Sequence, residues 1–165
     1  MAEIDIQPMG PADLAAVIAL ALSTPEIQDQ AERPAFFSLD TLERWIASPC
    51  DPLYVARCAG SFAGFIIASF HPLARIGYIY DLAVRGEYRG QGVGKALLEA
   101  ALKRLQTQQA SEIWCLVHQH NPAASRLFQH YGLQRGRRFD LHIWLADPGK
   151  NESEDERFPA PAGIR

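Results

Sequence analysis

The most informative part of the chain is an apolar run, Tyr78-Ile79-Tyr80-Asp81-Leu82-Ala83-Val84, followed after a short turn by Arg89-Gly90-Gln91-Gly92-Val93-Gly94-Lys95. The β-branched and aromatic residues of the first run predict a strand. After the second run, apolar residues recur at helical spacing, at Leu97, Leu98, Ala101, Leu102 and Leu105. The segment therefore predicts a strand that leads through a glycine-rich loop into an amphipathic helix.

Such a loop is a ready site for an anion. The first turn of a helix presents free backbone N–H groups and the positive end of the helix dipole at one point. Glycines at positions 90, 92 and 94 let phosphate oxygens approach the main chain without a Cβ in the way. Arg89 and Lys95 add cationic contacts. We therefore expect the loop to bind a pyrophosphate.

Two common phosphate-binding motifs fail here on residue identity. The dinucleotide motif G-x-G-x-x-G requires a third glycine where this chain has Lys95. A P-loop ending at Lys95 requires glycine in place of Arg89 and Ser or Thr in place of Ala96. Taken alone, the glycines also fit a plain strand-to-helix turn, so a second motif has to decide.

Shorter elements flank this segment. Before it, the pattern predicts a strand at 4–6, helices over 14–21 and 39–46 (the second capped by Ser38 or Asp40), and strands over 53–59, 62–70 and 76–84. Gly60-Ser61 is expected to be a two-residue hairpin turn. After it come a strand over 112–118, a helix opened by Asn121-Pro122 and closed by Gly132, and a strand over 139–145.

This order predicts an α/β fold of the α+β type, with a mixed, mostly antiparallel central sheet and helices on both faces. We expect one domain over residues 1–147. The tail, 148–165, is rich in Pro, Gly, Glu and Ser and is expected to be flexible or peripheral.

Composition narrows the classes of partner. Of 165 residues, 48% are apolar and 21% charged, as in an ordinary soluble domain, and the net charge of −3 attracts neither nucleic acid nor an anionic membrane. The basic run at 135–138 is interpreted as a solvated turn. Three cysteines without CxxC spacing argue against a disulfide scaffold or a zinc site. Apolar runs of about nine residues are too short to span a bilayer, and no basic signal region opens the chain, so a cytoplasmic location is expected.

Two motifs together resemble a known family. The first is Arg89-x-x-Gly92-x-Gly94 after a strand that ends in Asp-Leu-Ala-Val. The second is Asn121-x-x-Ala124-x-x-Leu127-Phe128-x-x-x-Gly132-Leu133. Both resemble the motifs of the GNAT superfamily of N-acetyltransferases, and with the strand order they cover roughly residues 62–145.

The resemblance implies a fold with splayed central strands and coenzyme A as the co-substrate. Pantetheine is expected along a bulged strand, where a backbone N–H near Leu82 or Ala83 stabilises the oxyanion. No metal is expected, because a thioester is already an activated acyl donor. The expected cofactor-binding residues are Leu82, Ala83, Val84, Arg89, Gly90, Gln91, Gly92, Val93, Gly94, Lys95, Asn121 and Phe128.

The acid–base groups are less clear, and Tyr80, Tyr78 and Tyr131 are the candidates. Strand alternation puts Tyr78 and Tyr80 on the face of Leu82, where relatives carry glutamate or histidine, and turns Asp81 away unless a bulge intervenes. A tyrosine that ionises near pH 10 is a poor base at neutral pH and is better suited to ordering a water relay.

Phe128 stands where the family usually has the tyrosine that protonates the departing thiolate. Tyr131, one turn further along the helix, either replaces that acid or packs in the core. Cys115 is interpreted as a buried strand residue because no activating partner is evident.

Two functions stay open. One is an N-acetyltransferase that moves an acetyl group from acetyl-CoA directly to a primary amine; the other is a non-catalytic acyl-CoA-binding module that has lost its general acid at Phe128. The acceptor is a small amine, an amino acid, or a protein N-terminus or lysine. Acceptor contacts are expected from 27–37, 71–75 and 135–139. The partners considered also include a second copy of the chain, in a homodimer.

Overall fold

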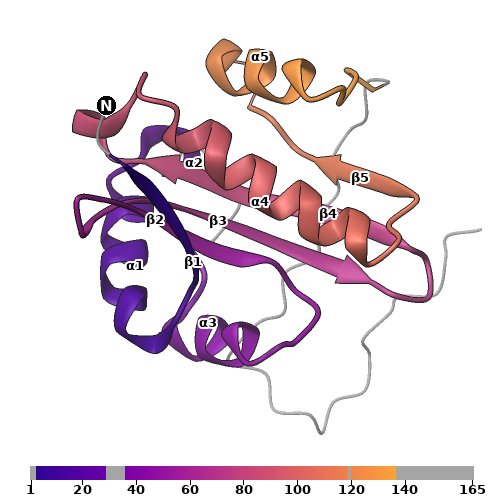
Figure 1. Ribbon diagram of the computed structural model, residues 1–165, viewed down its shortest axis with the longest axis horizontal. Coiled ribbons are helices and arrows are strands. Elements are labelled where there is room, and N and C mark those ends of the chain that lie inside the picture. Colours follow the sequence, from indigo (N-terminus) through magenta and orange to yellow (C-terminus); the bar gives the residue numbers. More distant parts are fainter. Residues whose placement is uncertain (1–2, 29–35, 119, 137–165) are drawn as a thin grey trace, which may run out of the picture.

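The computed structural model describes residues 3–28, 36–118 and 120–136. Five strands form one sheet in the order β1-β2-β3-β4-β5, as Figure 1 shows. Strands β1 to β4 pair antiparallel with one another, and β5 runs parallel to β4. The predicted mixed, mostly antiparallel sheet is therefore confirmed. The strands are β1 (Ile4–Pro8), β2 (Leu53–Cys58), β3 (Ser61–His71), β4 (Ile76–Val84) and β5 (Glu112–Cys115).

Helices cover both faces of this sheet. Buried residues of α4 pack with Ile66 and Ile79 on one face, together with Phe128 of α5. Residues of α1 and α3 pack with Phe65 and Ile67 on the other. The helices are α1 (Leu14–Leu22), α2 (Pro25–Gln28), α3 (Leu39–Ile46), α4 (Val93–Thr107) and α5 (Pro122–His130), with 3-10 turns η1 (Pro11–Asp13) and η2 (Gly86–Tyr88).

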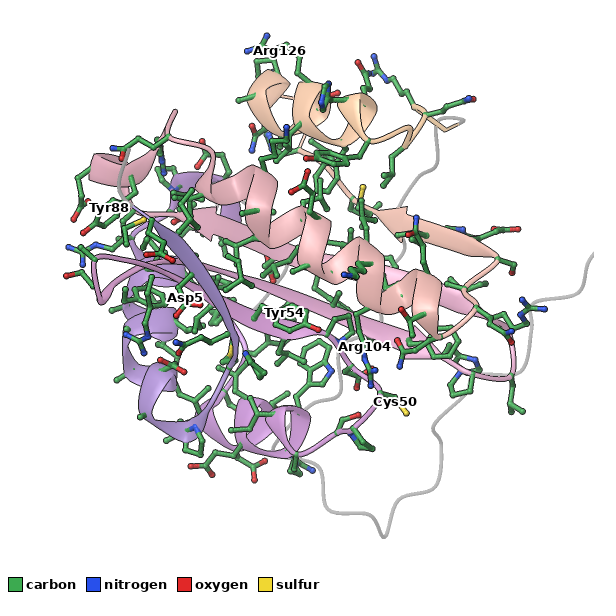
Figure 2. The ribbon with its side chains drawn as sticks, in the orientation of Figure 1. Asp5, Cys50, Tyr54, Tyr88, Arg104 and Arg126 are labelled. Carbon is green, nitrogen blue, oxygen red and sulfur yellow. The ribbon has the colours of Figure 1, made fainter. Side chains whose placement is uncertain are left out.

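The C-terminal half of α4 is held to the segment that follows α3. Arg104 Nη2 donates to the carbonyl oxygen of Pro49 at 2.7 Å, and Gln108 Nε2 donates to that of Cys50 at 2.6 Å. Figure 2 shows Arg104 beside Cys50. These bonds fix α4 across the sheet, and so fix the position of the loop at its N-terminus.

Local chemistry explains where the elements begin and end. Ser38, and not Asp40, caps α3 by accepting from the backbone N–H of Thr41. The β2–β3 hairpin turns at Ala59 and Gly60, whose φ angles of 47° and 79° are both positive, as a tight hairpin with two central residues requires. Ser61 already pairs with Cys58, so the predicted turn at Gly60-Ser61 was wrong by one residue.

Two strand ends also differ from the prediction. β1 runs on to Pro8, which the strand tolerates because β1 lies at the edge of the sheet. β5 ends at Cys115 and not at position 118, because the chain leaves β4 there. The predicted strand over 139–145 and the tail at 148–165 lie outside the described residues.

A bulge in β4 changes which side chains share a face. Ile67 of β3 lies opposite Asp81 and Ala68 lies opposite Ile79, so Tyr80 is an extra residue with no partner on β3. One extra residue shifts the alternation of the strand. Ile79 and Leu82 accordingly belong to the core beside α4, whereas Tyr80 belongs to the core beside α1 and α3. The prediction that Tyr80 and Leu82 share one face was wrong.

Candidate active site

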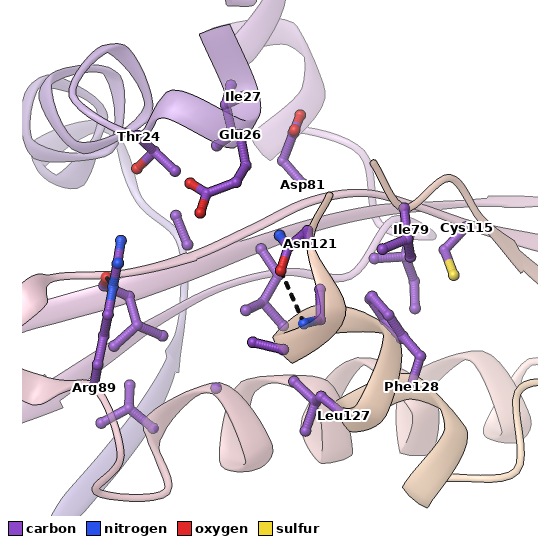
Figure 3. A pocket seen from close by; sticks show the side chains of 18 of the residues that line it. Thr24, Glu26, Ile27, Ile79, Asp81, Arg89, Cys115, Asn121, Leu127 and Phe128 are labelled. Carbon is purple, nitrogen blue, oxygen red and sulfur yellow. Dashed lines mark hydrogen bonds between the residues drawn. The ribbon is translucent and has the colours of Figure 1, made fainter. Parts of the chain in front are cut away.

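The sheet opens where β4 extends beyond the end of β5. Their pairing ends at Ile79 and Cys115. Beyond it, β4 continues to Val84 paired with β3 on one side, and in the part of the chain that the structure describes no strand pairs with its other side. A cavity of about 520 Å³ lies in this opening, walled by β4, the start of α4, residues 115–118 and α5 (Figure 3). All the predicted cofactor residues except Gln91 line it: Leu82, Ala83, Val84, Arg89, Gly90, Gly92, Val93, Gly94, Lys95, Asn121 and Phe128.

The phase of β4 decides which backbone groups face this cavity. The N–H of Arg85 donates to the carbonyl of Ala63 on β3 at 2.9 Å. The carbonyl oxygen of Ala83 also points to β3, since a Cβ added to Gly64 would lie 2.5 Å from it. Backbone groups alternate sides along a strand, so those of Leu82 and Val84 face the open side. Of the two backbone donors considered from sequence, this phase favours Leu82.

The glycine loop lies at the end of the cavity next to Val84. Gly90 and Gly92 have φ angles of 74° and 90°, in the left-handed region that favours glycine, and Gly92 caps the 15-residue helix α4. Arg89 and Lys95 line the same end. Gln91 does not line the cavity, and its side-chain nitrogen donates to the carbonyl of Glu87 at 2.7 Å.

Helix α5 forms the opposite wall. Asn121 Oδ1 accepts from the backbone N–H of Ala124 at 3.0 Å, so its amide nitrogen is the atom left to reach a ligand. Phe128 is 8% exposed and packs with the α4 side of the core. Figure 3 shows Phe128, Ile79 and Cys115 together, away from Arg89.

On the other side of β4 the cavity is acidic. Asp81 is 6% exposed and lines it, as does the half-buried Glu26 of α2. Figure 3 shows both on the side of the β4 ribbon away from Leu127 and Phe128. The bulge at Tyr80 accounts for Asp81 lining this cavity. Sequence reasoning missed Glu26, because the stretch after Pro25 carried no recognisable pattern.

A comparison with protein-family models identifies the family of the chain. The model described as the acetyltransferase (GNAT) family matches residues 17–133, which is most of the sequence. The chain belongs to the GNAT family. The resemblance inferred from the two motifs is confirmed.

Named relatives include two kinds of acetyltransferase. A mycothiol acetyltransferase of Thermobispora bispora is 32% identical over 124 residues, covering 70% of this chain and 42% of that protein. N-alpha-acetyltransferase 30 of Saccharomyces cerevisiae is 35% identical over 78 residues, covering 46% of this chain and 44% of that protein. The chain thus spans less than half the length of these two relatives.

A solved structure supports the fold. The PaiA N-acetyltransferase of Thermoplasma acidophilum, in complex with coenzyme A, superposes with a TM-score of 0.67 at 19% identity. The match covers 78% of this chain and 88% of that one. At this identity the likeness speaks for the GNAT fold alone.

The three tyrosines singled out from sequence take different positions in this GNAT domain. Tyr80 lines the cavity, meets Trp45 edge to face at 4.9 Å between ring centroids, and makes a tilted contact with Tyr78 at 4.6 Å. Tyr78 does not line the cavity. Tyr131 does not either: its hydroxyl donates to Glu99 Oε1 at 2.6 Å. Desolvation, with the hydrogen bond and charge of Glu99, raises the pKa of Tyr131 to about 12. The structure therefore brings only Tyr80 of the three to the cavity.

The Cys115 thiol has no feature of an activated nucleophile. Desolvation by burial raises its pKa to about 11, which keeps it protonated at neutral pH. Among the described residues, no three His, Cys, Asp or Glu side chains are placed to hold a metal ion. Within those same ranges, no helix is both long and apolar enough to cross a membrane.

Proposed function

We propose that this chain is an N-acetyltransferase that moves the acetyl group of acetyl-CoA directly to a primary amine in a ternary complex. One observation carries the proposal. The unpaired edge of β4, the glycine loop at the α4 N-terminus and an acidic wall all border a single cavity. A strand edge suits amide groups, a helix N-terminus suits phosphates, and carboxylates suit an amine. The names of the two curated relatives point to the same class of reaction.

The donor lies along β4. Backbone N–H groups of residues 90–95, with Arg89 and Lys95, hold the pyrophosphate. The Leu82 carbonyl and the Val84 N–H pair with the pantetheine amides, since the Val84 carbonyl accepts from Arg89 Nε at 3.0 Å. The amide nitrogen of Asn121 donates to the cofactor from α5. When the thioester carbonyl reaches the Leu82 N–H, that donor stabilises the developing oxyanion, an interaction typically worth about 3 kcal/mol.

The acceptor enters from the acidic side. A primary amine arrives largely as an ammonium ion, which the carboxylates of Glu26 and Asp81 attract. Asp81 accepts its proton, and Tyr80 forms the wall beside it. The neutral nitrogen then attacks the thioester carbon: a C–N bond forms and the C–S bond breaks.

The attacking nitrogen then gives up a second proton to water, which completes the amide. The sulfur departs as a thiolate, and a thiol with a pKa of about 8.5 makes this departure feasible with water as the proton donor. A side-chain acid is therefore not required where Phe128 stands.

Ligand-induced stabilisation tests the donor half of this proposal. Acetyl-CoA and coenzyme A should raise the melting temperature, since a ligand that binds only the folded state stabilises it by mass action. NADH and ATP serve as phosphate-bearing controls and should do much less. Equal stabilisation by NADH contradicts the coenzyme A assignment.

Turnover tests the transfer half. Thiol release is measured with acetyl-CoA and a panel of small amines, amino acids and peptides with free N-termini or lysines. Mass spectrometry should find one acetyl group on the amine of the active acceptor. Cofactor binding without thiol release for any acceptor supports the non-catalytic binding module instead.

A further inference from the structure

The end of the cavity where β4 and β5 part is lined by apolar side chains. Ile79 of β4 and Phe128 of α5 are 2% and 8% exposed, and the half-buried Cys115 of β5 lies beside them in Figure 3. All three line the cavity, and we call this group the apolar apex. It lies at the far end of the unpaired β4 segment from the glycine loop, so a ligand anchored on the loop would point toward it.

A length comparison places the acyl group there. Between its phosphate oxygen and its sulfur, pantetheine has about twelve bonds, as many as four residues of backbone, and spans roughly 13 Å when extended. Along β4, the distance from Val84 to Ile79 is about 16 Å. A pyrophosphate held on the glycine loop, beyond Val84, therefore puts the sulfur and the thioester carbonyl beside Leu82, and the acyl carbons point on along β4 toward Ile79.

The polar groups nearby turn away from the apex. Tyr131 donates its hydroxyl to Glu99 on α4, and the Asp81 and Glu26 carboxylates lie on the other side of β4. The Cys115 thiol stays protonated, because burial raises its pKa to about 11. In the part of the chain that the structure describes, the apex thus offers hydrocarbon and a neutral thiol, which suit methylene groups better than water.

We propose that the apolar apex binds acyl chains of three or four carbons, so that propionyl-CoA and butyryl-CoA are donors at least as good as acetyl-CoA. This rests on the proposed function and extends it to the acyl group. The transfer step is unchanged, because a longer acyl group forms the same C–N bond and releases the same thiolate. The preference for a longer acyl-CoA over acetyl-CoA comes from burial of the added methylenes, each worth roughly fourfold in affinity.

Binding is measured first, because it needs no acceptor. Isothermal titration of the full chain compares coenzyme A, acetyl-CoA, propionyl-CoA and butyryl-CoA. Butyryl-CoA should bind about tenfold more tightly than acetyl-CoA. If coenzyme A itself does not bind, the proposed function fails as well. If coenzyme A and acetyl-CoA bind and butyryl-CoA binds tenfold more weakly than acetyl-CoA, only the acyl inference is overturned.

A filled apex provides the second test. Cys115→Leu adds bulk beside Ile79 and Phe128 and should reverse the preference, lowering butyryl-CoA affinity about tenfold while changing acetyl-CoA affinity less. Trp114→Leu is the matched control: Trp114 is on the same strand, is 53% exposed and does not line the cavity. Its affinity ratio should equal that of the natural sequence.

A milder change guards against misfolding. If Cys115→Leu lowers the melting temperature sharply, Cys115→Val is used instead. It adds less volume and should change the ratio of butyryl-CoA to acetyl-CoA affinity in the same direction. An unchanged butyryl-to-acetyl ratio in a folded Cys115 variant overturns the proposal, because the acyl chain then lies elsewhere. Once an acceptor is known, kcat/KM for the same donors should follow the binding order.

Discussion

The two ends of the cavity differ in what carries their expected chemistry. At the glycine loop, the groups expected to act are backbone N–H groups, and residues 89–95 lie where the motif predicted them, with Gln91 alone off the wall. At the end where β4 bulges, side chains are expected to act, and the arrangement differs from the sequence prediction. Tyr131 turns to Glu99, Tyr78 lies off the cavity, and Asp81 lines it.

The difference teaches which predictions are robust. A backbone site needs only the path of the chain, which glycine positions and a helix start determine. A side-chain site also needs the phase of the strand, and one extra residue reverses that phase. Variants at the glycine loop should therefore change cofactor affinity, whereas variants at the bulged end of β4 should change kcat.

The largest effect is expected at the loop. Gly92→Val should weaken acetyl-CoA binding by about 4 kcal/mol, or roughly 1,000-fold in Kd, because a branched side chain at φ 90° strains the cradle and displaces phosphate contacts. Gly60→Val is the matched control, since Gly60 has φ 79° in a hairpin turn with open space around it. Both variants should lose stability, but only Gly92→Val should lose binding by titration. Equal Kd values in the two variants would remove the loop from the cofactor site.

The next effect separates Asp81 from Tyr80. Asp81→Asn keeps the shape of the side chain but removes the proton acceptor, and kcat should fall about 100-fold with acetyl-CoA affinity little changed. Tyr80→Phe should lower kcat only a few-fold, since the ring and its contact with Trp45 remain. Steady-state kinetics on the identified acceptor measures both. The reverse order of effects would make Tyr80 the proton-transfer residue after all.

A smaller effect is expected at Phe128. Phe128→Tyr puts a hydroxyl into the apolar apex and should keep or raise turnover with acetyl-CoA, by up to about tenfold if protonation of the thiolate limits the rate. The same hydroxyl should reduce the advantage of butyryl-CoA. Phe128→Leu provides the control without a hydroxyl. A large loss of acetyl transfer in Phe128→Tyr alone would show that the apex tolerates no polar group.

The smallest effect concerns Tyr131. Tyr131→Phe should leave kcat within about twofold, because the hydroxyl faces Glu99 outside the cavity. The raised pKa of Tyr131 means that the folded state holds this proton more tightly. Its stabilisation is thus complete below pH 10 and lost as the pH rises through about 12. At pH 7 the variant should lose under about 1 kcal/mol of unfolding free energy in urea titrations. A drop in kcat of tenfold or more would restore Tyr131 as an acid.

Much of the fold was predictable because local patterns carry it. The span of β4 matched its prediction. Helix α5 begins after Asn121 and ends before Gly132, as expected. The errors lie where an element's end depends on its pairing with another element or on an adjacent residue. The end of β5 depends on where β4 stops pairing, and the hairpin turn shifted to Ala59 because two positive φ angles are needed together.

The sequence alone predicted the sheet and the location of the glycine loop, since glycines, caps and hydrophobic periodicity act within a few residues of themselves. Its two motifs also carried the resemblance to the family. Only the tertiary structure decided that Asp81 and Glu26 border one cavity, because they come from elements far apart in the chain. It also decided that Leu82 faces away from Tyr80, since the bulge between them exists only in the pairing with β3. The backbone conformation of a loop depends on residues close together in the chain. Which side chains face each other across a cavity depends on the pairing of the strands.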